Sequence, residues 1–110
     1  YKSIEELSET EMRLGGLRIN PKTNKLEEGI EKQTDRIIEI FKEILNNVNW
    51  NLSNITKTRI FLADMKHYKK MNEVYAKHFT KEFPARFALA VKELPLNALI
   101  EIELNLSRLG

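Results

Sequence analysis

The sequence predicts an α+β fold in which two α-helices pack on one face of a mixed β-sheet. Two stretches carry apolar residues at spacings of three and four, which is the pattern of amphipathic helices. Other, shorter stretches alternate apolar and polar residues, which is the pattern of half-buried strands. Along the chain they follow in the order ββ-α-β-α-ββ. Two helices can cover only one face of such a sheet, so the other face is expected to pack against further subunits.

The first half of the chain is predicted to hold two strands, a turn and a long helix. Residues 1–18 form two short strands around a polar turn at 8–10, ending in Gly15-Gly16, and the Asn and Pro residues of 20–24 form another turn. The helix is expected over 29–49. Its apolar stripe consists of Ile30, Ile37, Phe41, Ile44, Leu45 and Val48, with Gln33, Thr34, Asn46 and Asn47 as polar positions around it.

The second half is predicted to hold a strand, a helix and two further strands. Residues 55–62 alternate and are rich in β-branched residues, and Asp64 is a suitable N-cap for a helix that runs to about Phe79. The stripe of this helix is Tyr68, Met71, Tyr75 and Phe79, with Asn72 one position off it. A loop at 81–84 precedes strands over about 85–93 and 99–106, which are joined around 94–97.

The last two strands carry the most informative pattern. Ile100, Ile102, Leu104 and Leu106 line one face of their strand, while Phe87, Leu89 and Val91 alternate with Arg86, Ala88 and Ala90 in the other. If both apolar rows face one core, Arg86 and Glu101 share the opposite face. The pair is then either a solvated cross-strand ion pair or a site where a guanidinium clamps a small carboxylate beside an acid/base group.

The composition narrows the functional classes. The 110 residues are 42% hydrophobic and 31% charged with a net charge of +2, so we expect one soluble domain over 1–110. Basic and acidic residues are interleaved, which argues against a nucleic-acid partner. The absence of cysteine excludes disulfides and thiolate chemistry, and His67 and His78 lack the spacing of a metal site and are expected to be solvated.

The chain shows neither a membrane-spanning run nor a signal peptide, so a cytoplasmic location without a membrane partner is expected. Because the sequence begins at Tyr1 rather than at methionine, we expect the natural N-terminus to lie upstream.

An ordered set of short motifs resembles the YjgF family, also called reactive intermediate deaminases. The motifs are Gln33-Thr34, Lys57-Thr58, Phe61-Leu62, Asp64-Met65, Met71-Asn72-Glu73-Val74-Tyr75, Phe83-Pro84-Ala85-Arg86, Leu94-Pro95 and Ile100-Glu101-Ile102-Glu103, and the resemblance spans about residues 15–107. It implies a chorismate-mutase-like fold, a homotrimer with clefts between subunits, and hydrolysis of 2-aminoacrylate and related enamines or imines. The products are a 2-oxo acid and ammonia, and no cofactor or metal is required.

The resemblance also implies which residues form the site. Arg86 takes the position of the family's carboxylate-binding arginine, and Glu101 that of the glutamate that handles water and protons. Asn72 matches an asparagine near the cleft, and Tyr1 falls close to the family's N-terminal tyrosine. Backbone groups near Ala88 are expected to position the substrate. Gly16 is expected to contribute to substrate binding. It lies in the segment Gly15-Gly16-Leu17, where the family often has Ser-Gly-Gln.

Three departures from the family pattern bear on activity. Leu17, Phe87 and Ala88 replace residues that are usually polar or, at the last position, cysteine. These three residues make the expected pocket more apolar. We therefore expect it either to prefer a larger or more apolar acid, or to bind its ligand without catalysing a reaction. The leading hypothesis is a 2-iminobutanoate/2-iminopropanoate deaminase, and the alternative is a non-catalytic trimer that binds small 2-oxo or amino acids. RNA cleavage has little support, because no aromatic residues interleave with a basic strip.

Overall fold

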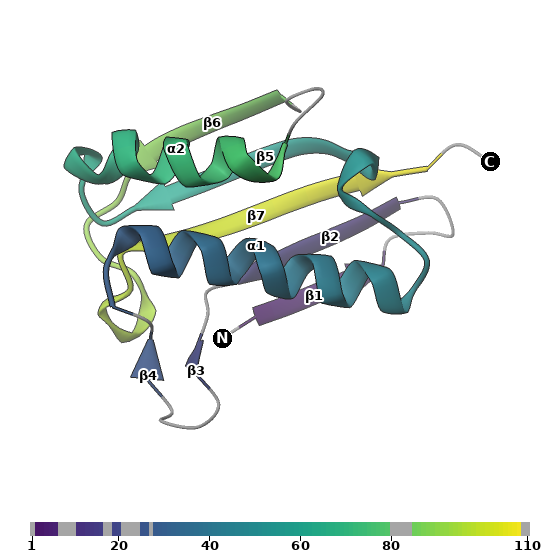
Figure 1. Ribbon diagram of the computed structural model, residues 1–110, viewed down its shortest axis with the longest axis horizontal. Helices are drawn as coiled ribbons and strands as arrows, with labels where there is room; N and C mark the ends of the chain where they lie inside the picture. The colour runs from purple at the N-terminus through teal and green to yellow at the C-terminus, as the bar shows by residue number, and fades with distance from the viewer. Residues whose placement is uncertain are drawn as a thin grey trace.

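A computed structural model describes residues 2–6, 11–16, 19–20, 25–26, 28–79 and 85–108 of the chain. It shows two helices on one side of a β-sheet (Figure 1). The strands and helices are β1 (Lys2–Glu6), β2 (Glu11–Gly16), β3 (Ile19–Asn20), β4 (Lys25–Leu26), α1 (Ile30–Asn47), β5 (Ile55–Leu62), α2 (Tyr68–His78), β6 (Ala85–Ala90) and β7 (Ile100–Ser107). Short 3₁₀ turns cover Leu52–Asn54, Met65–His67 and Pro95–Asn97.

The main sheet has five strands in the order β1-β2-β7-β5-β6. Its neighbours are antiparallel except for β5 and β6, which run parallel because α2 carries the chain from the end of one to the start of the other. The predicted α+β fold with a mixed sheet is therefore confirmed. The small antiparallel ribbon of β3 and β4 was not predicted from the sequence. The turn expected at 20–24 falls largely outside the described residues.

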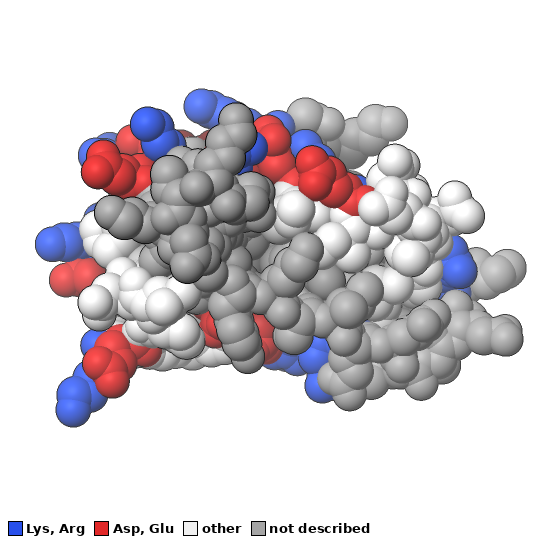
Figure 2. All heavy atoms as spheres, turned by 90° about the horizontal axis from the view of Figure 1, so that it is seen from below, with Lys and Arg blue, Asp and Glu red and all other residues white. Residues whose placement is uncertain are grey.

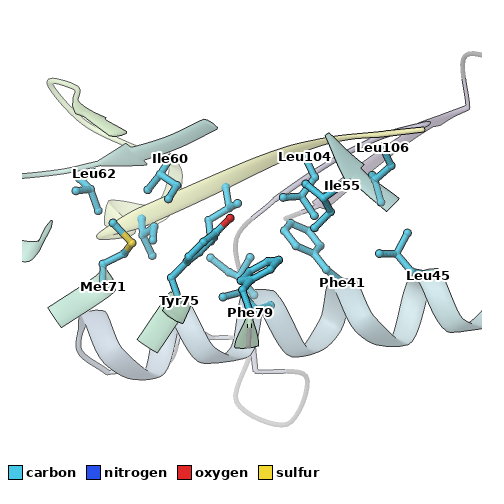
Figure 3. Close-up of a cluster of buried hydrophobic side chains, with 14 of the residues drawn as sticks. Phe41, Leu45, Ile55, Ile60, Leu62, Met71, Tyr75, Phe79, Leu104 and Leu106 are labelled. Carbon is cyan, nitrogen blue, oxygen red and sulfur yellow. The ribbon is translucent and has the colours of Figure 1, made fainter. Parts of the chain in front are cut away.

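Strand β7 runs through the middle of the sheet and carries one side of the core. Its burial alternates residue by residue, and the four apolar side chains that the sequence analysis placed inside are at most 2% exposed. Side chains from both helices point onto them (Figure 3). The core cluster includes Ile37, Phe41 and Leu45 of α1, Ile60 and Leu62 of β5, Met71 and Tyr75 of α2, and Ile102, Leu104 and Leu106 of β7.

Helix α1 ends at Asn47, two residues before the end expected from the sequence. Asn49 adopts a left-handed φ of 61°, and the N–H of Trp50 turns back to donate to the carbonyl of Leu45 at 2.8 Å. This geometry satisfies a carbonyl of the last turn, and asparagine tolerates it better than most residues do. The strand expected over 85–93 ends earlier, at Ala90.

Two polar residues of α1 lie in the core, although the sequence analysis had placed them around the apolar stripe. Gln33 is 5% exposed, and its Oε1 accepts a hydrogen bond from the N–H of Leu99 at 2.9 Å. Thr34 is fully buried and donates to the carbonyl of Ile30 at 2.7 Å. Both are buried because a partner satisfies the polar group, which hydrophobic periodicity alone cannot reveal.

The edges of both stripes also differ from expectation. Val48 and Tyr68 are 41% and 39% exposed, whereas Val74 is buried. Asp64 accepts a hydrogen bond from the N–H of Lys66 at 2.8 Å, so it caps the 3₁₀ turn that leads into α2 rather than α2 itself. That turn displaces the start of α2 by three residues, and Tyr68 is exposed rather than in the core.

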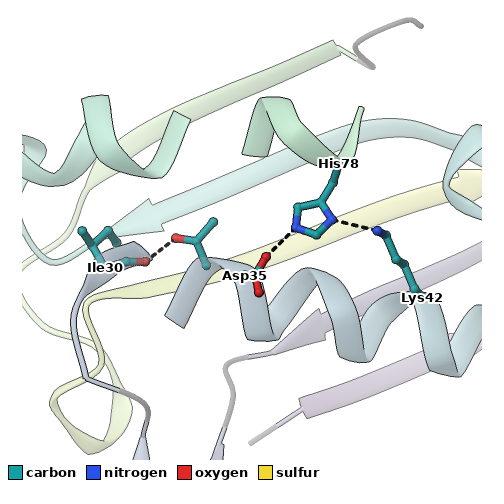
Figure 4. A network of polar contacts seen from close by, with 5 residues as sticks. Ile30, Asp35, Lys42 and His78 are labelled. Atoms are coloured by element: carbon teal, nitrogen blue, oxygen red, sulfur yellow. Dashed lines mark hydrogen bonds and ion pairs between the residues drawn. The ribbon is translucent and has the colours of Figure 1, made fainter. Parts of the chain in front are cut away.

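A polar network joins the two helices (Figure 4). His78 Nε2 lies 2.8 Å from Asp35 Oδ1, and His78 Nδ1 lies 2.8 Å from Lys42 Nζ. A charged ammonium can only donate, so Nδ1 accepts and Nε2–H donates to the carboxylate. The His78 side chain is only 9% exposed, so the expectation that it is solvated is wrong. It is buried because its two nitrogens have partners on the neighbouring helix.

We expect His78→Ala to lower the free energy of unfolding by about 1–2 kcal/mol, because it removes two charge-assisted hydrogen bonds whose partners are themselves partly exposed. The measurement is urea denaturation followed by circular dichroism. His67→Ala is the matched control, since no hydrogen bond of the His67 side chain is found in the part of the chain that the structure describes. Equal losses in the two variants would contradict a stabilising role for the network.

Candidate functional site

Arg86 lies on the helix-covered face of the sheet, near the start of edge strand β6. In the parallel pair it is in register with Thr58 of β5, which is fully buried beneath α2. The Arg86 guanidinium carbon lies 4.7 Å from the centroid of the Tyr75 ring, and its Nη1 is buried. The Tyr75 hydroxyl donates to Thr58 Oγ1 at 3.0 Å. The guanidinium thus lies against Tyr75 of α2, and Tyr75 is bonded in turn to Thr58 of β5.

This placement corrects the sequence-based assignment of faces in β6. Phe87 and Leu89, which were expected in the core, are 41% and 40% exposed on the outer face of the sheet. Lys57 Nζ lies 5.5 Å from the centroid of the Phe87 ring on that face. The reason is steric: α2 lies over this part of the sheet (Figure 1), and the small, half-buried Ala88 leaves room for it where Phe87 or Leu89 would not.

Glu101 lies on the opposite, outer face. It sits between Ile100 and Ile102, whose side chains are completely buried under the helices. It is two strands away from β6 and three residues further along than Arg86, which at ordinary strand spacing amounts to about 14 Å in the plane of the sheet. The expectation that Arg86 and Glu101 share a face is therefore wrong, and one protomer does not bring them together.

The surroundings of Glu101 favour its neutral form. Burial raises the pKa of its carboxyl above the ordinary value of 4.5, and the negative charge of Glu103 on the same face raises it further. A carboxyl with a raised pKa exchanges protons more readily near neutral pH, as a general acid or base must.

Asn72 and Ala88 lie on the same side of the sheet as Arg86. Asn72 is one turn before Tyr75 on α2, and its buried Oδ1 has no hydrogen-bond partner among the described residues. Ala88 is half-buried, in register with Ile60, and packs against the core. A buried amide oxygen without a partner is costly, so a ligand that donates to it would be favoured there.

Gly16 lies in the strand next to that of Glu101 and three strands away from Arg86. It is the last residue of β2 and pairs with Ile102, so its backbone is beside the start of β7. Tyr1 lies outside the described residues. The predicted site thus separates into an arginine half-site (Asn72, Tyr75, Arg86 and Ala88) on the helix side and a glutamate half-site (Glu101) on the outer side. Gly16 is in register with the buried Ile102, not with a residue of the outer face.

Tyr75 and Thr58 were not predicted as site residues. Tyr75 falls on the apolar stripe of its helix, and the only signal for another role was its place in the Met71–Tyr75 motif. A separate depression of about 570 Å³ lies between the end of α1 and the 3₁₀ turn at Leu52–Asn54, with Trp50 and Lys42 among its lining residues. None of the predicted site residues lines it.

Comparisons with known proteins match most of the chain. The family model described as Endoribonuclease L-PSP matches residues 12–106. A RutC family protein of Pyrococcus horikoshii is 42% identical over 90 residues, which are 81% of this chain and 71% of the relative. The chloroplastic Reactive Intermediate Deaminase A of Arabidopsis thaliana is 43% identical over 81% of this chain and 48% of its own length. The crystal structure of RidA from an Antarctic Psychrobacter is similar with a TM-score of 0.89 and 28% identity, covering 98% of this chain and 88% of that one.

We expect the Glu101 carboxyl to titrate with a midpoint above 4.5 in the folded protein, measured by carboxyl ¹³C NMR. Glu103→Gln removes the neighbouring charge, so it is expected to lower this midpoint part of the way towards the ordinary value. A midpoint at or below the ordinary value would contradict the burial of Glu101.

The same shift affects stability. A carboxyl with a raised pKa binds its proton more tightly in the folded state, so its contribution to stability falls as the pH rises from 4.5 through the folded pKa. Glu101→Gln removes this loss and is expected to stabilise the protein relative to wild type more at pH 7 than at pH 4.

Proposed function

Because the chain belongs to the Endoribonuclease L-PSP family, which includes the YjgF, RutC and RidA proteins, we propose that it hydrolyses 2-aminoacrylate-type enamines and imines. The family resemblance drawn from the short motifs is confirmed, and a deaminase role in general agrees with the relative named Reactive Intermediate Deaminase A. The proposed products are a 2-oxo acid and ammonia, which makes the protein a 2-iminobutanoate/2-iminopropanoate deaminase. The observation that carries this proposal is the guanidinium of Arg86, which is held against Tyr75. One turn earlier on α2 lies Asn72, whose buried amide oxygen has no hydrogen-bond partner among the described residues.

The arginine half-site supplies the binding part of the reaction. A planar guanidinium binds a carboxylate through two parallel hydrogen bonds, which fixes both the position and the orientation of a small 2-amino acid derivative. The Asn72 oxygen can accept a hydrogen bond from the substrate nitrogen. Ala88 and its neighbours leave an apolar wall, which suits the methylene or ethylidene end of the enamine.

The chemistry itself requires only proton transfers and water. A proton moves from the enamine nitrogen to the β-carbon and gives the imine; water then adds to the imine carbon and forms a carbinolamine. The carbon–nitrogen bond breaks as the hydroxyl collapses to the carbonyl, and ammonia leaves with the remaining proton. Glu101 is proposed to take the proton from the water and return it to nitrogen, a role worth on the order of 10²- to 10⁴-fold in rate.

The separation of the half-sites supports a site between subunits. Arg86 is on an edge strand and Glu101 on the outer face, so a second protomer is needed to bring a glutamate to an arginine. The outer face is suited to such contact, since Phe87 and Leu89 are exposed next to the Arg59–Glu103 ion pair at 3.8 Å. We propose a homotrimer in which Arg86 of one protomer and Glu101 of the next share a cleft.

The non-catalytic binder is the second candidate, and one observation favours it. Within a protomer Arg86 and Tyr75 lie together on the helix side of the sheet, whereas Glu101 lies on the other face. A trimer that binds small 2-oxo or amino acids needs only the arginine half-site.

The remaining parts of the proposal concern partners and location. The face seen in Figure 2 interleaves acidic and basic residues along its edges, which gives no support to a nucleic-acid partner on the described part of that face. Neither of the described helices has the length and hydropathy of a membrane span. We propose that residues 1–110 form a single domain of the family and act in the cytoplasm, although relatives include a chloroplastic and a mitochondrial protein.

The deciding assay couples the protein to a pyridoxal-phosphate dehydratase that generates 2-aminoacrylate, and follows ammonia release with the uncatalysed rate subtracted. We expect Glu101→Gln to lower the catalysed rate at least about tenfold while leaving 2-oxobutyrate affinity unchanged or improved. Arg86→Ala is expected to weaken 2-oxobutyrate binding at least about thirtyfold, because breaking a buried charge pair costs a few kcal/mol.

Two substitutions on exposed positions of α1, Arg36→Ala and Glu39→Gln, serve as matched controls. A wild-type protein that binds 2-oxobutyrate without accelerating hydrolysis establishes the binding-protein alternative. Unchanged affinity in Arg86→Ala would place the ligand elsewhere.

The trimer is tested separately by multi-angle light scattering, with an expected mass of three times 12.9 kDa. Leu89→Asp places a charge on the outer sheet face and is expected to shift the mass towards the monomer. Leu96→Asp is the matched control, because Leu96 is 62% exposed on the β6–β7 loop and its left-handed φ of 60° tolerates aspartate. A stable wild-type monomer at micromolar concentration would refute the intersubunit cleft.

A further inference from the structure

The contact between Arg86 and Tyr75 places a flexible charged side chain on a rigid surface. The guanidinium carbon is 4.7 Å from the ring centroid, well within the range of a cation–π interaction. Tyr75 is 1% exposed and its ring stacks on Phe79 with 4.4 Å between centroids, so packing holds the ring in one conformation. Contact with a buried ring restricts the rotamers of a long arginine side chain.

The phenol is itself fixed at its far end. Its hydroxyl donates to Thr58 Oγ1, and Thr58 is the β5 residue in register with Arg86. The three side chains therefore form a closed arrangement: the strand pairing sets the spacing of Thr58 and Arg86, and Tyr75 from α2 bridges them. Figure 3 shows Tyr75 reaching from α2 into the core with its oxygen towards the sheet.

We propose that Tyr75, anchored by Thr58, is a positioning residue that fixes the plane of the Arg86 guanidinium so that its donors meet a substrate carboxylate in bidentate geometry. The carboxylate part of this inference rests on the proposed function. The positioning part does not, because it concerns the ligand-free protein. Tyr75 acts through Arg86 and is not itself a catalytic residue.

The electrostatics of Tyr75 agree with this role. Burial raises the pKa of its hydroxyl above 10.0, although the bond to Thr58 and the charge of Arg86 oppose the shift. The phenol is therefore neutral at physiological pH. A phenolate beside Arg86 would pair with the guanidinium and compete with the carboxylate, whereas a neutral ring supports the cation without occupying its donors.

The first experiment reads the position of Arg86 without any ligand. In ¹⁵N-arginine NMR spectra, the ring current of Tyr75 is expected to shift the Arg86 side-chain protons upfield. The shift is expected to disappear in Tyr75→Leu and to remain in Tyr75→Phe, which keeps the ring. Phe41→Leu is the matched control, since it also replaces a core aromatic residue at 1% exposure but packs under α1 near Leu104. An Arg86 shift that is the same in wild type and Tyr75→Leu overturns the proposal.

The second experiment measures 2-oxobutyrate affinity by calorimetry. Tyr75→Leu is expected to weaken binding about tenfold, and Phe41→Leu less than twofold at a similar loss of stability. If hydrolysis is catalysed, KM should rise by the same factor while kcat changes little. Equal affinity losses in these two variants would mean a merely structural role and overturn the proposal.

Substitutions at Thr58 keep the proposal testable if Tyr75→Leu does not fold. Thr58→Val removes the hydroxyl at nearly constant shape and is expected to weaken 2-oxobutyrate binding several-fold, whereas Thr58→Ser keeps the hydroxyl and is expected to retain affinity. Equal 2-oxobutyrate affinities in Thr58→Val and Thr58→Ser would refute the claim that the Thr58 hydroxyl fixes Tyr75. A wild-type protein that does not bind 2-oxobutyrate refutes the proposed function instead, and the ring-current shift alone then decides whether Tyr75 positions Arg86.

Discussion

The parallel pairing of β5 with β6 determines where every candidate residue of β6 lies. Successive residues of a strand alternate between faces, so the register Thr58–Arg86 sends Arg86 and Ala88 under α2 and turns Phe87 and Leu89 outward. A slip of one residue would place Phe87 and Leu89 beneath the helix and Arg86 in solvent. The hydrogen bond from Tyr75 to Thr58 and the stack of Arg86 on Tyr75 both depend on this register. The arginine half-site is thus a consequence of how one edge strand is aligned.

The strongly periodic elements could be predicted from the sequence. The face of a strand could not be predicted where its residues fit both the core and the solvent-exposed surface. In β7 the alternation is strict and one row is strongly apolar, so its inner face was assigned correctly. In β6 both rows are compatible with burial: one has large apolar side chains and the other has alanines, and only the position of α2 decides between them. Gln33 and His78 follow the same logic, because each is buried only by virtue of a partner 66 or 43 residues away.

The candidate site shows the same division between local and long-range information. The motifs identify Arg86, Glu101 and Asn72 as residues of interest, but motifs do not state which residues of one chain meet. Tyr75 was assigned to the core, which is correct, and this assignment hid its second contact. Its partners, Thr58 and Arg86, come from two different strands, and no local pattern connects them. The apolar periodicity of a helix shows which side chains face the core. Which residues those side chains then contact depends on how the other elements pack.

The opposition of Arg86 and Glu101 across the sheet has a consequence for how activity would depend on assembly. If a substrate needs both groups, a lone protomer can bind the carboxylate but has no base next to it. Packing of a second protomer on the outer face would bury Glu101 further, and further desolvation raises the pKa of a carboxyl. Assembly would then both deliver the glutamate to the arginine and move its pKa in the direction that general acid/base catalysis requires. In that arrangement the exposed Phe87 and Leu89 supply the contact area, and the charge pair of Arg59 with Glu103 restricts which surface fits against it.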